Sequence, residues 1–317
     1  MNKNSILNRK SLNILAPAKL NLHLQILGLR NDNYHEMAMV MQSIDLYDKI
    51  TILNTSEEDL TLETESTELG NSDDNLIIKA AKLLKNYSSK TNLGARIKLQ
   101  KNIPIGAGLA GGSSDAAATL FGLNKLWELG YSNKKLEFLC SQIGSDIPFC
   151  LSGGTQLCFG RGEILEPVYL ENNSMAVILV KDPNANVSTP WAYSLSKQYN
   201  INNYLSTESE FEHHRNLLRN AKWLKNLTPF NPPPLQNDLQ YFISPRIASV
   251  KRALDILNSI PEALAFAMSG SGPSCFAIFS DFKSAQFALE KNKSRFIKAG
   301  LETWCCSFLN KGVNLDL

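Results

Sequence analysis

Alternating apolar and polar positions near the start of the chain predict a long β-strand over residues 12–28. The alternation sets Leu20, Leu22, Leu24 and Ile26 against Lys19, Asn21, His23 and Gln25. Side chains of a strand point alternately to its two faces, so one face enters a core and the other carries Lys19, Asn21 and His23 together. More sheet is predicted over 37–53, after a polar turn at 30–33.

The rest of the chain mixes helical and strand patterns, which predicts an α+β protein. Helical spacing of apolar residues occurs at 75–87, 115–129, 132–143, 247–257 and 284–297, and strand patterns at 60–62, 95–101, 155–159, 176–180, 275–279 and the end of the chain. The stretch 194–236 is polar, helical in part, and ends in three prolines. The composition changes near residue 165, which predicts two domains, 1–165 and 166–317.

Composition and charge narrow the class of protein. Hydrophobic residues make up 44% and charged residues 20% of the 317 residues, which suits a packed core, and the net charge of +2 argues against nucleic acid as a partner. The longest uncharged stretch, 263–280, predicts no membrane span because glycines and serines interrupt it. The N-terminus predicts no secretory signal because no apolar region follows its first charges. The six cysteines form no CxxC pair, and the four histidines complete no zinc spacing. We therefore expect a cytoplasmic protein with reduced thiols and no membrane association.

A glycine-rich loop at 104–114 is the strongest local signal for a ligand site. It consists of Pro104, Ile105, Gly106, Ala107, Gly108, Leu109, Ala110, Gly111, Gly112, Ser113 and Ser114. We expect Ser113 or Ser114 to cap the helix that follows, whose N-terminus offers unpaired N–H groups and the positive end of a dipole. Phosphate is the natural ligand of such a loop, although a plain turn between strand and helix is an alternative.

Three common phosphate sites do not fit this loop. Its G-x-G-x-x-G pattern would need a strand after the helix and an acidic residue about 20 residues further on, but a second helix follows. A P-loop would need lysine where Gly112 stands. A protein kinase would carry a His-Arg-Asp motif, and the sequence has none.

Lys19 and Asp146 are candidates for chemistry on an alcohol. Phosphoryl transfer to a hydroxyl needs charge neutralisation and a group that orients or deprotonates that hydroxyl. Taken singly, Lys19 also suits a solvated strand edge and Asp146 a helix cap. Their separation in the sequence does not show whether they meet.

Five motifs in a fixed order resemble the GHMP kinase superfamily. They are Ala16-Pro17-Ala18-Lys19-Leu20-Asn21-Leu22, Tyr34-His35, the 104–114 loop, Gly144-Ser145-Asp146-Ile147-Pro148 and Ser269-Gly270-Ser271-Gly272. The resemblance runs from about residue 14 to 315, nearly the whole chain. It implies a two-domain fold, with an N-terminal ribosomal-protein-S5-domain-2-like domain that binds ATP and a C-terminal ferredoxin-like domain, and an active site between them.

The resemblance also implies an activity. ATP would bind along 104–114 and phosphorylate a small alcohol, with Mg²⁺ expected although no carboxylate stands out as its ligand. Asp146 would accept the hydroxyl proton, and Lys19 would stabilise the charge of Asp146 and orient the hydroxyl. The motifs around Lys19 and Tyr34 favour the branch whose acceptor is the 2-hydroxyl of cytidyl methylerythritol diphosphate, in the non-mevalonate isoprenoid pathway. A kinase of the homoserine or mevalonate type, or a non-enzymatic ligand-binding relative, stays an alternative.

The same resemblance assigns residues to the acceptor. Tyr34, His35 and Tyr193 would sandwich and hydrogen-bond the cytosine, and aromatic faces and an imidazole are suited to that task. Asn21 would contact the substrate beside Lys19. Gly270, Ser271 and Gly272 would surround the diphosphate of the acceptor. The sequence predicts no oligomeric state.

Overall fold

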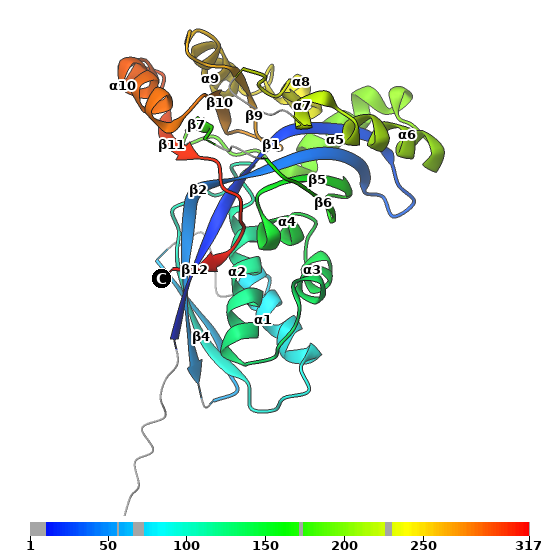
Figure 1. Ribbon diagram of the computed structural model, residues 1–317, viewed down its shortest axis with the longest axis vertical. Coiled ribbons are helices and arrows are strands. Elements are labelled where there is room, and N and C mark those ends of the chain that lie inside the picture. Colours follow the sequence, from blue (N-terminus) through cyan, green and yellow to red (C-terminus); the bar gives the residue numbers. More distant parts are fainter. Residues whose placement is uncertain (1–10, 56, 66–72, 171–173, 226–229, 317) are drawn as a thin grey trace, which may run out of the picture.

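The computed structural model describes residues 11–316 except 56, 66–72, 171–173 and 226–229. Residues 1–10, in which the sequence predicts no secretory signal, lie outside the described residues. Two β-sheets organise the described chain, and the long strands β1 (Ser11–Leu29) and β2 (His35–Thr55) run from the lower into the upper part of the molecule (Figure 1). In the described chain, no helix is both long and apolar enough to cross a bilayer.

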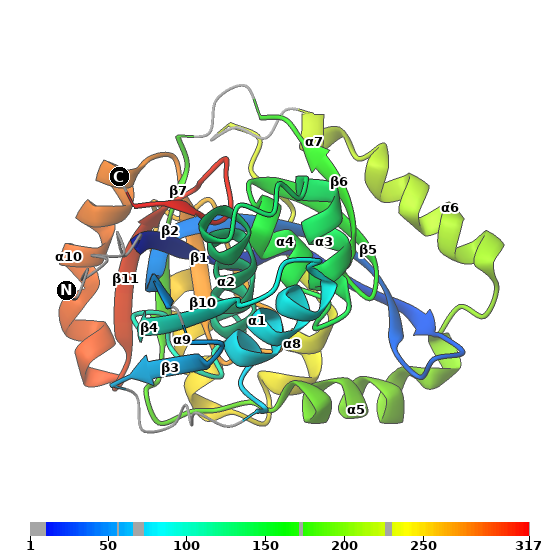
Figure 2. The same ribbon diagram turned by 90° about the horizontal axis from the view of Figure 1, so that it is seen from below.

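The first sheet is built on the antiparallel pair of β1 and β2. Its strand order is β12-β1-β2-β4-β3, while β5 pairs with β2, β6 with β5 and β8 with β1. These strands are β3 (Leu60–Thr64), β4 (Gly94–Gln100), β5 (Thr155–Gly160), β6 (Ile164–Val168), β8 (Gln236–Asn237) and β12 (Asn314–Leu315). Its helices gather together in the view from below (Figure 2): α1 (Leu76–Tyr87), α2 (Gly111–Leu126), α3 (Asn133–Ser141) and α4 (Ile147–Ser152).

The second sheet is antiparallel with the order β11-β7-β10-β9. Along the chain its elements are β7 (Ala176–Lys181), α9 (Ala248–Asn258), β9 (Ala265–Met268), β10 (Cys275–Phe279), α10 (Phe282–Lys298) and β11 (Glu302–Ser307). Strand, helix, two strands, helix and strand in this order make a ferredoxin-like domain, so the α+β prediction is confirmed. The boundary at 165 stays a prediction; β6 crosses that position, and β8 and β12 return to the first sheet.

The polar stretch 194–236 is partly helical, as predicted. It contains most of α5 (Thr189–Asn200), then η1 (Ile201–Asn203), α6 (Glu208–Arg219) and α7 (Lys222–Lys225), and α8 (Asp238–Ile243) follows it. The backbone N–H of Leu205 donates to the carbonyl of Leu27 over 2.8 Å, and the Phe211 ring lies close to Gly28. Helix α6 therefore lies beside the far end of the β1–β2 hairpin.

Two sequence expectations about helix α2 are wrong. Helix α2 begins at Gly111 and ends at Leu126, instead of running from Asp115 to Leu129. Neither Ser113 nor Ser114 caps it, because Ala110 occupies the N-cap position in a left-handed conformation (φ 55°), and no side chain of the described residues caps the helix there. The pattern also missed α4, β6 and β9, which are too short to show a period.

A buried ion cluster ties α2 to the first sheet. The Lys101 ammonium contacts the carboxylates of Asp48 and Asp115, the latter over 3.0 Å, and Asp48 also accepts the backbone N–H groups of Asn102 and Ile103. Burial opposes the charge on Lys101, but the two carboxylates raise the pKa of Lys101 above its ordinary value. Burial and the neighbouring Asp48 raise the pKa of Asp115 well above its usual range. One cation thus holds two carboxylates below the glycine-rich loop.

Replacing Lys101 by methionine should destabilise the fold, because two buried carboxylates lose their counter-charge. We expect the free energy of unfolding to fall by about 3–5 kcal/mol, and the added substitution Asp115→Asn to restore part of it. Denaturant unfolding measures both. The control is Lys49→Met, whose exposed pair with Asp316 should contribute less than about 1 kcal/mol. Equal losses for the two lysines would contradict the role of the cluster.

Candidate active site

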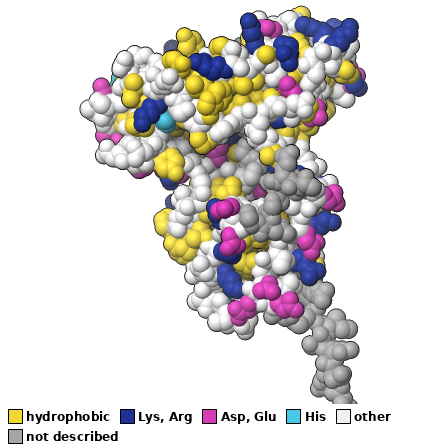
Figure 3. Space-filling view, turned by 180° about the vertical axis from the view of Figure 1, so that it is seen from behind, with side chains coloured by type: hydrophobic (Ala, Val, Ile, Leu, Met, Phe, Trp, Pro, Cys, Tyr) yellow, Lys and Arg dark blue, Asp and Glu magenta, His cyan; other side chains and the backbone are white. Residues whose placement is uncertain are grey.

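A cavity of about 770 Å³ lies where elements of the two sheets meet. The molecule has a broad upper and a narrower lower part with a waist between them (Figure 3). The cavity is lined by the glycine-rich loop, by the first two strands and by residues of the C-terminal half such as Tyr193 and Ser271. Its volume suits a small-molecule site.

Lys19 and Asp146 meet inside this cavity. The Lys19 Nζ lies 3.5 Å from an Asp146 carboxylate oxygen and donates to the Asn21 side-chain oxygen over 2.7 Å. The side chain of Lys19 is 6% exposed and that of Asp146 33%. Asp146 precedes α4, yet its carboxylate makes no capping bond to the described backbone there. The structure therefore places both groups where a substrate hydroxyl could contact them.

The prediction that His23 shares a face with Lys19 and Asn21 is wrong. The pairing of β1 with β2 skips one residue between Asn21 and His23, a β-bulge. A bulge exchanges the faces of the residues beyond it, so Leu24 lines the cavity with Lys19 and Asn21. His23 is half-buried outside the cavity lining, its buried Nε2 has no hydrogen-bond partner among the described residues, and burial lowers the pKa of its imidazole.

The glycine-rich loop lines the cavity from Pro104 to Ser113. Left-handed backbone at Gly106, Gly108 and Ala110 folds the loop back so that the N-terminus of α2 faces the cavity. Ser114, also predicted to bind ATP, is fully buried behind that lining. A helix N-terminus that carries no side-chain cap in the described chain suits a phosphate.

The second loop, at 269–272, packs directly on the first. The Ser269 hydroxyl donates to the carbonyl of Gly108 over 3.1 Å, and a Cβ atom on Gly108 would lie 2.2 Å from the Ser269 carbonyl. Gly270 and Ser271 line the cavity, and the Ser271 hydroxyl is 3.1 Å from that of Thr189. Gly272 packs toward Met268 and does not line the cavity. The loops lie so close that only glycine fits at 108.

Aromatic residues also line the cavity. His35 stacks on Tyr193 with ring centroids 5.1 Å apart, and Tyr34 is 53% exposed with the guanidinium of Arg161 over its ring at 4.9 Å. The His35 Nε2 is buried and has no hydrogen-bond partner among the described residues. Burial, together with the charge of Lys197, lowers the pKa of His35, so its imidazole is neutral at pH 7. An unpaired buried nitrogen of this kind can serve a ligand.

Sequence reasoning missed several residues of the site. Lys101, Arg161 and Lys197 bring positive charge to the cavity lining. Asn237 supports the second loop, since its side-chain amide donates to the carbonyls of Met268 and Gly270 over 2.7 and 2.9 Å. Of these residues, only Arg161 could have been found from the sequence, because it stands between two glycines. Both glycines have positive φ in the structure.

Comparison with known proteins places this geometry in a family. The family models for the N-terminal and the C-terminal domain of GHMP kinases match residues 75–154 and 213–298. A 4-diphosphocytidyl-2-C-methyl-D-erythritol kinase from Prochlorococcus marinus is 56% identical over all of this chain and 99% of its own length. One from a Synechococcus strain is 52% identical over 96% of this chain and 99% of its own.

Solved structures of GHMP kinases have a fold similar to that of this chain. A crystal structure of 4-(cytidine 5'-diphospho)-2C-methyl-D-erythritol kinase is similar at a TM-score of 0.71 and 27% identity, over 94% of this chain and 99% of that chain. A homoserine kinase from Cytophaga hutchinsonii shares the fold at a TM-score of 0.68 and 18% identity, over 99% of both chains. With full-length relatives above half identity, the chain belongs to the GHMP kinases and, within them, to the family of 4-diphosphocytidyl-2-C-methyl-D-erythritol kinases.

Proposed function

We propose that this protein transfers the γ-phosphoryl group of ATP to the 2-hydroxyl of 4-diphosphocytidyl-2-C-methyl-D-erythritol, giving the 2-phosphate and ADP. The observation that carries the proposal is the Lys19–Asp146 pair, which lies beside a phosphate-suited loop in a cavity that aromatic side chains also line. The family of the relatives supports the choice of acceptor.

The reaction requires a group that accepts the proton of the attacking hydroxyl and groups that hold this hydroxyl in place. The Asp146 carboxylate would accept the proton of the attacking hydroxyl as general base. Lys19 would hold that carboxylate and the hydroxyl oxygen in place, and Asn21, already bonded to Lys19, would orient the acceptor beside it. The donor phosphates would lie along 104–113, held by backbone N–H groups and the N-terminus of α2.

The diphosphate and the cytosine base of the acceptor would contact other residues of the cavity. Gly270 and Ser271 would contact the diphosphate, with Gly272 shaping the loop from behind. Tyr34 and Tyr193 would hold the cytosine between them. The free Nε2 of His35 would make a hydrogen bond to the base edge.

Mg²⁺ is expected as the partner of ATP, since it neutralises the phosphates in phosphoryl transfer. Within the described residues, no three His, Cys, Asp or Glu side chains come together as metal ligands. Asp115 lines the cavity, but one of its carboxylate oxygens is buried and the other pairs with Lys101, so we assign no carboxylate to the ion. We propose that ATP phosphates supply most of its ligands.

A coupled ADP-release assay tests the proposal. The purified protein is given ATP, Mg²⁺ and one acceptor at a time: the cytidyl methylerythritol diphosphate, its uridyl analogue, mevalonate or homoserine. Turnover with the cytidyl acceptor well above the others is the expected result. Preference for mevalonate or homoserine would move the protein to another branch, and binding without turnover of any acceptor would indicate a non-enzymatic relative.

Asp146→Asn should nearly abolish turnover and leave ATP affinity intact, because it keeps the shape of the side chain and removes the proton acceptor. We expect kcat to fall by roughly 10²–10⁴-fold. Steady-state kinetics and nucleotide calorimetry measure the two effects. Asp255→Asn, an exposed carboxylate of α9, is the control. A kcat of Asp146→Asn close to that of wild type would show that another group takes the proton.

Tyr34→Ala and Tyr193→Ala should each raise the KM for the cytidyl acceptor by about one to two orders of magnitude, the value of a lost base stack. The KM for ATP should change little, because we expect the donor on the 104–113 loop and not on these two rings. His35→Ala should reduce the preference for cytidine over uridine, since the bond to the base edge is lost. The control is Tyr241→Ala, an 80% exposed ring outside the cavity lining. Unchanged constants in all three variants would disprove the base site and leave the kinase chemistry standing.

A further inference from the structure

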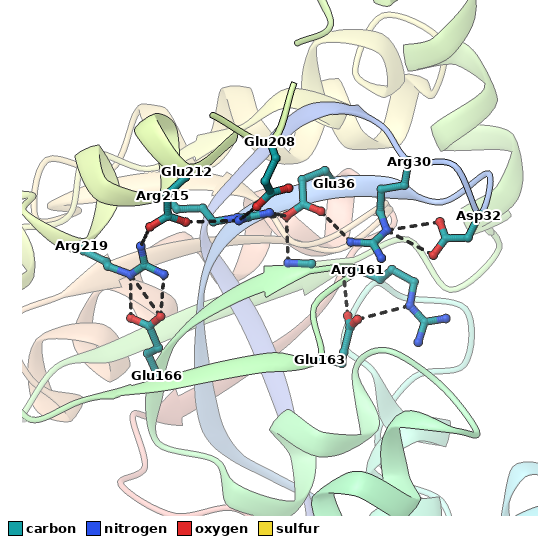
Figure 4. Close-up of polar contacts among 11 residues, drawn as sticks. Arg30, Asp32, Glu36, Arg161, Glu163, Glu166, Glu208, Glu212, Arg215 and Arg219 are labelled. Atoms are coloured by element: carbon teal, nitrogen blue, oxygen red, sulfur yellow. Dashed lines mark hydrogen bonds and ion pairs between the residues drawn. The ribbon is translucent and has the colours of Figure 1, made fainter. Parts of the chain in front are cut away.

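Glu36 is a buried carboxylate that directly follows His35 and does not line the cavity. It is 1% exposed. One of its oxygens accepts from Arg30 over 2.7 Å, and the other accepts from Arg215 over 2.6 Å and from the backbone N–H of Gly160 over 3.1 Å (Figure 4). A charge at this depth is costly without partners, and both of its oxygens are satisfied by groups from three different segments.

The first segment is the hairpin turn that carries Tyr34 and His35. Arg30 enters this turn and Glu36 leaves it, so their ion pair closes the turn at its base. Inside the turn, the Asp32 carboxylate pairs with Arg30 over 3.2 Å and accepts the backbone N–H of Tyr34 over 3.1 Å. The orientation of Tyr34 is thereby linked to Glu36 through two side chains.

The second segment is the turn between β5 and β6. The bond from Gly160 to Glu36 fixes the start of this turn, and the backbone N–H of Arg161 donates to Glu163 over 2.7 Å. The Arg161 guanidinium lies over the Tyr34 ring. Glu36 therefore fixes the residues on both sides of this cation–aromatic contact.

The third segment is α6, from the polar stretch 194–236. Arg215 contacts Glu36 through two of its nitrogens and is held from its own helix by Glu208 and Glu212. Its side chain is 11% exposed. Arg219, one turn further on, pairs with Glu166 and Glu212 instead and does not contact Glu36 (Figure 4).

We propose that Glu36 is a positioning residue for the base-binding end of the cavity, with Arg215 of α6 as its counter-charge. The pair holds Tyr34, His35 and Arg161 in the arrangement that receives the pyrimidine, and this is the task of α6. The proposal rests on the proposed function, because it needs a base to be bound there. Neither residue touches the reacting groups, so the effect falls on acceptor binding alone.

The test compares Glu36→Gln and Arg215→Met with the matched control Arg219→Met. Residues outside a ligand site typically change coupling to it by 0.5–2 kcal/mol, so the KM for the cytidyl acceptor should rise about 3- to 30-fold in the first two variants. The KM for ATP, and kcat at saturating acceptor, should stay within about twofold of wild type, below that range. Calorimetry with cytidine 5'-diphosphate should show the same loss of affinity without any turnover. Arg219→Met should change none of these values.

The double variant Glu36→Gln/Arg215→Met adds a readout that general destabilisation would not give. If the two residues act as one pair, its KM should equal that of the worse single variant, whereas Arg219→Met, which shares no partner with Glu36, should combine additively with Glu36→Gln. Arg215→Lys, which keeps the charge, should recover part of the affinity. If Glu36→Gln does not fold, Arg215→Met and Arg215→Lys decide the question.

Wild-type behaviour separates the two proposals. Suppose that wild type turns over the cytidyl acceptor. If the Glu36 and Arg215 variants then keep the wild-type KM, or show a lower kcat together with higher KM values for both substrates, the positioning role is wrong and the function stands. If wild type neither binds cytidine 5'-diphosphate nor turns over the acceptor, the proposed function fails and this inference fails with it.

Discussion

Lys19 carries a positive charge into the interior, and the layout of the site follows from the groups that compensate it. A buried ammonium is stable only where polar partners replace its hydration. Asn21 and Asp146 provide these partners, from the same strand and from the start of α4. The backbone N–H of Lys19 also donates to the carbonyl of Leu109 over 3.1 Å, which joins the strand to the glycine-rich loop. One residue thus brings together the donor loop and the carboxylate proposed as the base.

The second constraint is the close approach of two loops from opposite halves of the chain. Gly108 packs on Ser269, and a Cβ atom on Gly270 would lie 3.4 Å from the Lys19 Nζ. No side chain fits between the loops at Gly108, so ligands on either loop lie near the same ammonium group. Phosphoryl transfer depends on such proximity, because holding two reactants in line removes much of the entropic cost of their meeting.

The sequence predicts the parts of this site better than their contacts. Periodicity gave both long strands, and the glycine pattern gave the loop, since both signals are local. The bulge after Asn21 left no mark in the alternation, so His23 was assigned to the wrong face. The left-handed turn at Ala110 was hidden because such a conformation is rare for alanine. The Glu36–Arg215 pair joins residues far apart in the chain, and such contacts follow from the tertiary fold.

The central claim is that the acceptor hydroxyl lies between the Lys19–Asp146 pair and the donor phosphate. Its most direct test is a crystal structure with a non-hydrolysable ATP analogue and 4-diphosphocytidyl-2-C-methyl-D-erythritol bound together. The account predicts the 2-hydroxyl oxygen within about 2.6–3.2 Å of the Asp146 carboxylate, beside the Lys19 Nζ and in line with the terminal phosphate. An acceptor bound with that hydroxyl against other groups, and with Asp146 turned away from it, would contradict the account.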